Sequence, residues 1–328
     1  MTSVERRSFL QLISNACSEE GILDQPGKLP CLEAKNSGRQ NSAKSIPAPR
    51  FSLSQISTYR SSWEEDLRGL DASPMGAVGI WLPKLAEFDN KVVLRRLRET
   101  ELSVSSVSYV GGFTGSNGES FAQALDHAYE TMFMASAMKA KCVVVTPGSR
   151  GRYTAKHERK LVTQTVRELA CLGHELGLDV AVLPMRAELS RRWTFLHSIE
   201  DARSLLADVN HPRAGLAIDS FQHLSSAADV LELGALAREI KHVQLSDLNL
   251  DDRTEYSRSL PGDGDLPLLE LVSSLQANGY RGYFDIQVWS RDVWGQPHEA
   301  VVQQCDDWVR MVQMAIGAAN DAMVVGRV

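Results

Sequence analysis

The chain of 328 residues is predicted to fold as a (β/α)8 barrel preceded by an N-terminal arm. From Phe51 onward, short apolar runs alternate with longer helical patterns, which is the signature of repeated βα units and a parallel sheet. Eight such units over about 270 residues fit a (β/α)8 barrel, whose usual size is roughly 250 residues. The functional residues of such a barrel lie at the carboxyl ends of its strands.

An open, doubly wound sheet is the alternative fold. It is weakened because no glycine-rich phosphate turn follows the first strand, where the sequence reads Ser54-Gln-Ile-Ser-Thr-Tyr-Arg60.

The predicted elements follow one another in a regular order. The strands are expected to begin near Phe51, Ala77, Leu102, Cys142, Asp179, Gly215, His242 and Gly282. The clearest helices are expected over residues 120–140, 154–176, 199–209, 228–240 and 266–277, and a last helix over residues 298–319 after Pro297.

The two ends of the chain are expected to lie outside the barrel. Residues 1–50 are predicted to be an arm or linker, because residues 27–50 are rich in polar residues, Pro and Gly. The barrel is expected over residues 51–322 and a short tail over residues 323–328. Arg6-Arg7 resembles a twin-arginine export signal, but no clear apolar region follows, so a cytoplasmic location is expected.

Composition restricts the class of partner. The formal net charge of -6 argues against nucleic-acid binding, which needs a basic face. The five cysteines are odd in number and lack a CxxC spacing, which favours a reducing compartment over a disulfide framework or zinc site. No run approaches the roughly 18 apolar residues of a membrane span. A small-molecule ligand is therefore expected, without nucleic acid or membrane.

Polar side chains close three of the late strands. Asp219 ends an apolar sixth strand, where a carboxylate is a good ligand for a hard metal ion. Gln244 shares a face of the seventh strand with His242, and its carbonyl could bind a metal or a sugar hydroxyl. The eighth strand places Asp285 and Gln287 on one face. A turn Asp and a buried Gln satisfied by its neighbours are the competing interpretations.

Other candidates for ligand binding lie beside these strand ends. Arg258 begins a loop with Pro and Gly that is expected to cross the mouth, where a guanidinium suits a phosphate or carboxylate. Trp81 and Tyr109 close the second and third strands, and Trp289 follows Gln287 by two residues. These rings could stack on a sugar ring or pack in the core.

Several segments together resemble sugar phosphate isomerases/epimerases of the xylose-isomerase-like TIM-barrel superfamily. They are Phe51-Ser-Leu-Ser-Gln-Ile-Ser-Thr-Tyr59, Gly79-Ile-Trp-Leu82, Ala217-Ile-Asp-Ser-Phe221, His242-Val-Gln-Leu-Ser-Asp247, Leu260-Pro-Gly-Asp-Gly-Asp265 and Tyr283-Phe-Asp-Ile-Gln-Val-Trp-Ser290. The resemblance covers nearly the whole region from Phe51 to about Ala319.

The resemblance implies a site for one divalent metal, Mg, Mn or Zn, held by four side chains. Asp219, Gln244 and Gln287 stand at three of these positions, and Leu183 stands where the family has a glutamate. The histidine of the family's D-x-x-H motif is replaced by Gln222, with His223 one residue later.

The departures at residues 183 and 287 affect catalysis as well as metal binding. The family uses glutamates at these two positions to move a proton between substrate carbons. Leu cannot bind a metal and Gln cannot titrate as a base, so the catalytic residues stay unassigned. The expected substrate-binding residues are Arg258, Trp81, His223, Asp247 and Trp289.

The resemblance implies an isomerase, epimerase or lyase that acts on a sugar or hydroxylated acid by proton transfer, with a degenerate metal site. The alternative is a non-catalytic sugar-binding protein or a partner subunit of an active relative. A homo-oligomer stays open. An endonuclease of the related DNA-repair branch is opposed by the net charge and by the apolar fifth strand.

Overall fold

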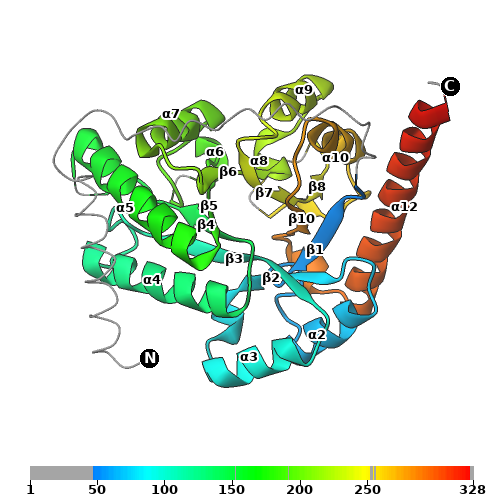
Figure 1. The fold of residues 1–328 in the computed structure, drawn as a ribbon, viewed down its shortest axis with the longest axis horizontal. Coiled ribbons are helices and arrows are strands. Elements are labelled where there is room, and N and C mark those ends of the chain that lie inside the picture. Colours follow the sequence, from blue (N-terminus) through cyan, green and yellow to red (C-terminus); the bar gives the residue numbers. More distant parts are fainter. Residues whose placement is uncertain (1–46, 152, 191, 252–253, 255, 326–328) are drawn as a thin grey trace, which may run out of the picture. The chain divides into compact units, whose positions relative to one another are not determined.

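The computed structural model describes residues 47–325 apart from residues 152, 191, 252–253 and 255. The predicted arm over residues 1–50, which includes Arg6-Arg7, lies almost wholly outside the described residues. The described chain forms a closed barrel of parallel strands surrounded by helices (Figure 1). The prediction of a (β/α)8 barrel is confirmed, and the doubly wound alternative is wrong.

Each predicted barrel strand is present. The strands follow the circular order β1-β10-β7-β6-β5-β4-β3-β2. Their bounds are β1 (Arg50–Ser54), β2 (Ala77–Trp81), β3 (Ser103–Gly111), β4 (Cys142–Thr146), β5 (Asp179–Val182), β6 (Ala214–Asp219), β7 (Ile240–Leu245) and β10 (Tyr283–Ile286). A short antiparallel pair after β7 was not predicted, and consists of β8 (Asp247–Leu248) and β9 (Arg258–Ser259).

Several of the helices begin at a residue whose side chain caps them. They are α2 (Trp63–Asp71), α3 (Asn90–Arg98), α4 (Phe121–Ala137), α5 (Ala155–Leu176), α6 (Ala187–Ser190), α7 (Ile199–Val209), α8 (Ser220–His223), α9 (Ala227–Ala235), α10 (Leu268–Ala277), α11 (Arg291–Trp294) and α12 (His298–Val325), with a 3-10 turn η1 (Leu82–Leu85). A serine precedes α2, α4, α7 and α9, and each forms a reciprocal capping box with the third helical residue.

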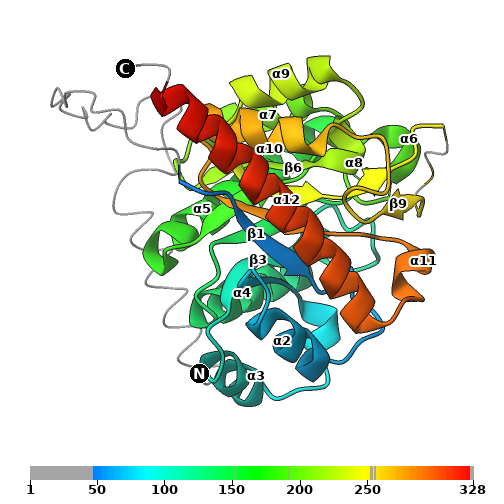
Figure 2. The ribbon, with the colours of Figure 1, turned by 90° about the vertical axis from the view of Figure 1, so that its right-hand side faces the viewer.

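Two helices differ in length from the prediction. The helix expected over residues 228–240 ends at Ala235, because tight turns follow: the N–H of Ala237 donates to the Gly234 carbonyl and that of Glu239 to the Leu236 carbonyl. The last helix continues to Val325, and Figure 2 shows it along the outside of the barrel next to β1 and α2. No helix in the described part of the chain is long and apolar enough to cross a bilayer.

The barrel interior holds polar side chains at two levels. The alternation of side chains along a strand places His242 on the same face as Gln244, two residues earlier on β7, and Asp285 on the same face as Gln287, two residues earlier on the last strand. The Ser52 hydroxyl donates to Asp285 Oδ1 at 2.5 Å. A Cβ on residue 79 would lie 2.5 Å from Asp285 Oδ2, so the carboxylate requires Gly79 opposite it.

A second buried polar cluster joins the segments that follow β1 and β2. Asp66, on α2, accepts hydrogen bonds from Gln55 Nε2 at 3.1 Å and Thr58 Oγ1 at 2.7 Å. Its carboxylate pairs with Lys84 Nζ at 2.6 Å. Gln55 Oε1 accepts the N–H of Trp81 at 3.0 Å, so the cluster also fixes the end of β2. Burial lowers the pKa of Lys84, and the Asp66 carboxylate opposes that effect.

Removing the Asp66 carboxylate should therefore destabilise the fold. We expect Asp66→Ala to lower the free energy of unfolding by about 3–5 kcal/mol, because it leaves the buried Lys84 ammonium without its counter-ion. Urea denaturation measures the change. The exposed Asp71 on the same helix supplies the control, since Asp71→Ala should shift the free energy by about 0.5 kcal/mol or less. Equal effects of the two substitutions would contradict this role for Asp66.

Candidate ligand-binding site

An ion pair closes one side of the barrel mouth. β9 pairs with β8 and carries Arg258 over the end of β6. Arg258 Nη1 lies 2.9 Å and 2.8 Å from the two carboxylate oxygens of Asp219, and 3.2 Å from Ser246 Oγ. Both side chains are buried, and the guanidinium also lies 4.0 Å above the centre of the Phe221 ring. The structure thus places Asp219 and Arg258 in direct contact.

Asp247 holds the loop after β7, which carries Arg258. The Asp247 carboxylate accepts the backbone N–H of Leu248 at 2.9 Å, of Gly262 at 3.0 Å and of Leu266 at 3.0 Å. A Cβ on residue 264 would lie 2.5 Å from Asp247 Oδ1, which explains the second glycine of the Leu260-Pro-Gly-Asp-Gly-Asp265 segment. Asp247 therefore orders the loop, and its predicted contact with substrate stays a prediction.

A hydrogen-bonded group of three residues forms the floor of the mouth. Gln287 Nε2 donates to Tyr109 Oη, and Tyr109 Oη donates to Gln244 Oε1 at 3.4 Å. Ser54 Oγ donates to Gln287 Oε1 at 3.5 Å. Gln244 lies beside Asp219 in the sheet register. Asp219, Gln244 and Gln287 therefore converge at one end of the barrel, as their strand positions predicted.

Tyr109 stays a neutral phenol over the physiological range. Burial raises the pKa of Tyr109 to about 12, and the Asp219 carboxylate adds to the rise. The hydrogen bond from Gln287 and the charge of Arg258 act in the opposite direction. A neutral hydroxyl at this position can both donate and accept a hydrogen bond.

Two adjoining pockets open at this end of the barrel. The smaller has a volume of about 50 Å³ and is lined by Tyr109, Met185, Trp193, Phe221, Gln222, Tyr256, Arg258 and Trp289. The larger has a volume of about 240 Å³ and lies over the glycine-rich segment after β3 and the start of α4. Tyr109 and Trp193 line both pockets, so a single ligand could occupy the two together.

Aromatic rings surround the small pocket. The Trp289 ring lies 6.3 Å from that of Trp81, 6.2 Å from that of Trp193 and 6.1 Å from that of Trp294. Trp289 lines the pocket directly, whereas Trp81 lies next to the Trp289 ring and is not among the lining residues, so its predicted contact with substrate stays a prediction. Flat apolar rings next to hydrogen-bonding groups suit a ligand with both hydroxyls and C–H faces.

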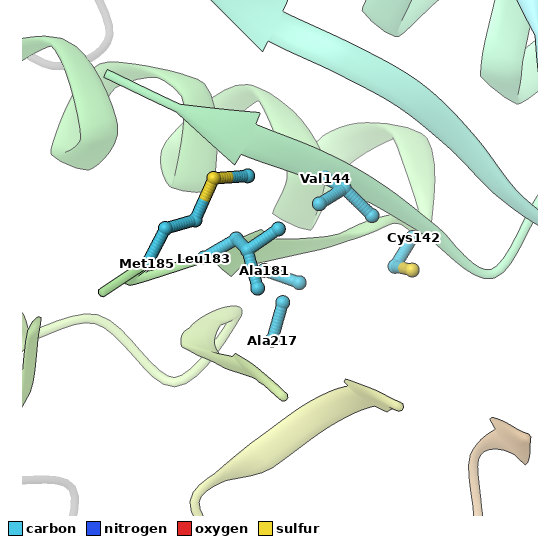
Figure 3. Packing of buried hydrophobic residues seen from close by; sticks show 6 residues of the cluster. All are labelled: Cys142, Val144, Ala181, Leu183, Met185 and Ala217. Carbon is cyan, nitrogen blue, oxygen red and sulfur yellow. The ribbon is translucent and has the colours of Figure 1, made fainter. Parts of the chain in front are cut away.

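Leu183 belongs to the apolar core. It is fully buried in a cluster with Cys142, Val144, Ala181, Met185 and Ala217, which lie on β4, β5 and β6 and in the segment just after β5 (Figure 3). The partly buried rings of Tyr109 and Trp193 pack against this cluster. Residue 183 therefore packs the barrel and offers no oxygen or nitrogen to a ligand.

His223 turns back on its own segment. Its Nδ1 lies 3.0 Å from the Asp219 carbonyl oxygen, and it lines neither of the two pockets. Burial lowers the pKa of His223 to about 4, against the opposing charge of Asp219. The imidazole is therefore neutral at physiological pH, and its predicted role in substrate binding stays a prediction.

A buried pair lies below the floor. His242 Nε2 and Asp285 Oδ2 are 3.7 Å apart, which is an ion-pair distance rather than a hydrogen bond. Burial by itself lowers the pKa of His242, but the neighbouring Cys142 and Asp285 outweigh it and raise the pKa to about 10. His242 is thus positively charged at neutral pH, deep in the barrel.

The residues at the mouth do not fit a divalent metal ion. Asp219 already bonds through both oxygens to a guanidinium, and a dication beside Arg258 would be repelled by several kcal/mol, about 4 kcal/mol per unit charge at 4 Å. Leu183 supplies no ligand. Within the described ranges, no group of three or more His, Cys, Asp or Glu side chains could hold a metal ion.

Some residues of the pocket were not predicted from the sequence. Trp193, Met185 and Tyr256 line it from loops outside the strands. A tryptophan in the loop after the fifth strand was a usable signal, because loops at carboxyl strand ends build the sites of such barrels. Tyr256 gave no comparable signal, because its place depends on the unpredicted β8–β9 pair.

The fold and the pockets define a (β/α)8 barrel with a small-molecule site at the carboxyl ends of its strands. Residues 69–311 match the family model described as xylose isomerase-like TIM barrel. The match spans most of the barrel, and this chain belongs to that family.

Individual relatives are distant. An inosose dehydratase of Clostridium perfringens is 23% identical over 243 residues, which cover 66% of this chain and 79% of that protein. A fructoselysine 3-epimerase of Escherichia coli O157:H7 is 24% identical over 168 residues, which cover 51% of this chain and 59% of that protein. The crystal structure of IOLI protein with a binding zinc atom superposes with a TM-score of 0.68 at 16% identity, covering 81% of this chain and 99% of that one. Such a likeness shows a shared fold.

The buried His242–Asp285 pair predicts a pH-dependent stability. The folded-state pKa of His242 is raised from 6.5 to about 10. The contribution of protonated His242 to the free energy of unfolding is therefore complete below pH 6.5 and is lost as the pH rises through about 10. We expect His242→Gln to cost about 3–5 kcal/mol of unfolding free energy at neutral pH. The difference from the wild type should shrink towards pH 10.

Denaturant unfolding at several pH values measures this difference. The exposed His157 provides the matched control through His157→Gln. A wild-type advantage over His242→Gln that stays constant from pH 6.5 to 10 would show that His242 is not charged in the fold.

Proposed function

We propose that this protein is sugar isomerase/epimerase-like and binds a sugar or hydroxylated acid in the two adjoining pockets at the barrel mouth. The observation that carries the proposal is the small pocket itself, where Arg258 and Tyr109 meet the Trp193 and Trp289 rings. Two ligand-directed donors beside flat apolar rings match the alternating hydroxyls and C–H groups of a sugar. The names of the two relatives, a dehydratase and an epimerase, support the same substrate class.

Proton transfer in this site would need an acid and a base. Tyr109 is the candidate acid, because the residue lines both pockets and its hydroxyl keeps its proton below a pKa of about 12. In the larger pocket, His127 and Glu119 lie 3.5 Å apart and are the candidate base pair. The route thus differs from the paired glutamates that the resemblance implied at residues 183 and 287.

A non-catalytic binding protein is the second candidate. One observation favours it: the described residues that line the small pocket include no His, Asp, Glu, Lys or Cys side chain that could serve as a base. Leu183 stands where the resemblance implied a glutamate, and its burial in an apolar cluster means that this position supplies no base.

Solvent isotope exchange separates the two candidates. Enzymes that move a proton between carbon and solvent incorporate deuterium at the reacting carbon, so ¹H NMR of a panel of ketoses, aldoses and hydroxy acids in D₂O detects turnover without knowledge of the product. We expect exchange with at least one sugar and a loss of roughly 100-fold or more in Tyr109→Phe, the usual scale for a general acid. Binding without exchange for every compound that binds would establish the non-catalytic candidate.

The aromatic wall supplies a test of the pocket itself. We expect Trp289→Ala to weaken binding of the best ligand in that panel by about tenfold or more, because the ring covers one side of the small pocket. Isothermal titration calorimetry measures the affinity. Tyr153, which is exposed and lines neither pocket, gives the control Tyr153→Ala. An unchanged affinity in Trp289→Ala would place the ligand elsewhere.

A further inference from the structure

Resting on the proposed function, we infer that the Arg258 guanidinium supplies the fixed positive charge of this site in place of a divalent metal, and that the small pocket binds the carboxylate or phosphate group of an acidic sugar derivative. Three observations support this inference. They are the way in which Arg258 is hydrogen bonded, the kind of buried atom that lacks a partner, and the size of the pocket.

The first observation concerns which edge of the guanidinium is used. All hydrogen bonds of Arg258 to the described residues run from Nη1, to Asp219 and to Ser246. Arg258 Nε is buried and has no hydrogen-bond partner in the described chain. The Nε–Nη2 edge therefore stays available, and this edge can bind a planar oxyanion through two parallel hydrogen bonds.

The second observation concerns the polarity of the unsatisfied groups. Gln244 Nε2, beside Asp219 in the sheet, is likewise buried without a partner among the residues that the structure describes, although Gln244 lines neither pocket. Both atoms are hydrogen-bond donors, and the unpaired acceptor Asp285 Oδ2 lies deeper in the barrel, 3.7 Å from His242. A metal ion needs lone pairs, whereas the spare Arg258 Nε donor at the small pocket needs an acceptor such as a carboxylate or phosphate oxygen. Buried donors left without an acceptor are unfavourable, so a ligand oxygen would relieve that cost.

The third observation concerns room. The small pocket, at about 50 Å³, has space for a group of the size of a few water molecules, and Arg258 lines it. The rest of a sugar chain can extend past Trp193 and Tyr109 into the pocket of about 240 Å³. The arrangement thus separates a charged end, held at Arg258, from a hydroxylated body.

Metal content and binding test the two halves of this inference. The protein, purified and dialysed without chelator, should contain no stoichiometric divalent metal by elemental analysis. Calorimetry with D-fructose, D-fructose 6-phosphate and D-glucuronate should show that at least one acidic compound binds about tenfold or more tightly than the neutral sugar. EDTA should leave that affinity unchanged. Preference for the phosphate or for the carboxylate identifies which oxyanion the pocket takes.

The matched variants isolate the guanidinium. Arg258→Gln should reduce the affinity for the acidic compound by about tenfold or more and bring it close to that of D-fructose. Because this change leaves Asp219 buried without a counter-ion, the double variant Asp219→Asn with Arg258→Gln repeats the measurement on a neutral pair. Arg238→Gln, an exposed position outside both pockets, is the control.

Several outcomes would overturn the inference. Stoichiometric metal in the wild type, or binding abolished by EDTA, would show that a cation other than Arg258 acts in the site. An equal affinity for acidic and neutral compounds would show that the small pocket does not bind a charged group of the ligand. A double variant that retains the preference for the acidic compound would show the same. Because D-fructose binding or isotope exchange can survive each of these results, they leave the proposed function standing.

Discussion

The contact between Asp219 and Arg258 is the constraint on which the rest of the site depends. A carboxylate that is almost wholly removed from water must find a cation or give up its charge, because an isolated buried ion is very unfavourable. Asp219 ends a strand whose neighbours are apolar, so its cation has to arrive from another part of the chain. The short pair of strands after β7 brings it there.

The surrounding backbone is organised to hold that cation still. Ser246 contacts Arg258 through its hydroxyl and is itself tied to Ser220, whose Oγ donates to the Ser246 carbonyl at 2.6 Å and accepts its N–H at 2.9 Å. Asp247 then fixes the returning chain through three backbone N–H groups. The adjacent residues Ser246 and Asp247 thus have different roles. Ser246 contacts the guanidinium, and Asp247 orders the loop that carries Arg258.

Much of this barrel could be predicted from the sequence, because each βα unit carries a local pattern of apolar residues, caps and turns. The alternation along β6, β7 and β10 also placed Asp219, Gln244 and Gln287 at one end correctly. The pattern could not predict which partner each polar side chain contacts. Arg258 was expected to hold a ligand, but its contact with Asp219 depends on the antiparallel pairing of Leu248 with Arg258. Strands of two residues leave no recognisable pattern in the sequence. The part that Asp247 plays in ordering the loop could not be predicted, because two of its three backbone partners lie 15 and 19 residues further along the chain.

The hairpin formed by β8 and β9 has a consequence for how this barrel can diversify. Because Leu248 and Arg258 are paired across its base, the residues between them form a closed excursion whose ends are anchored independently of its contents. Tyr256, two residues before Arg258, lines the small pocket. Substitutions between Leu248 and Arg258 could therefore change the shape of the small pocket during evolution, while the Arg258 guanidinium stays in the same position.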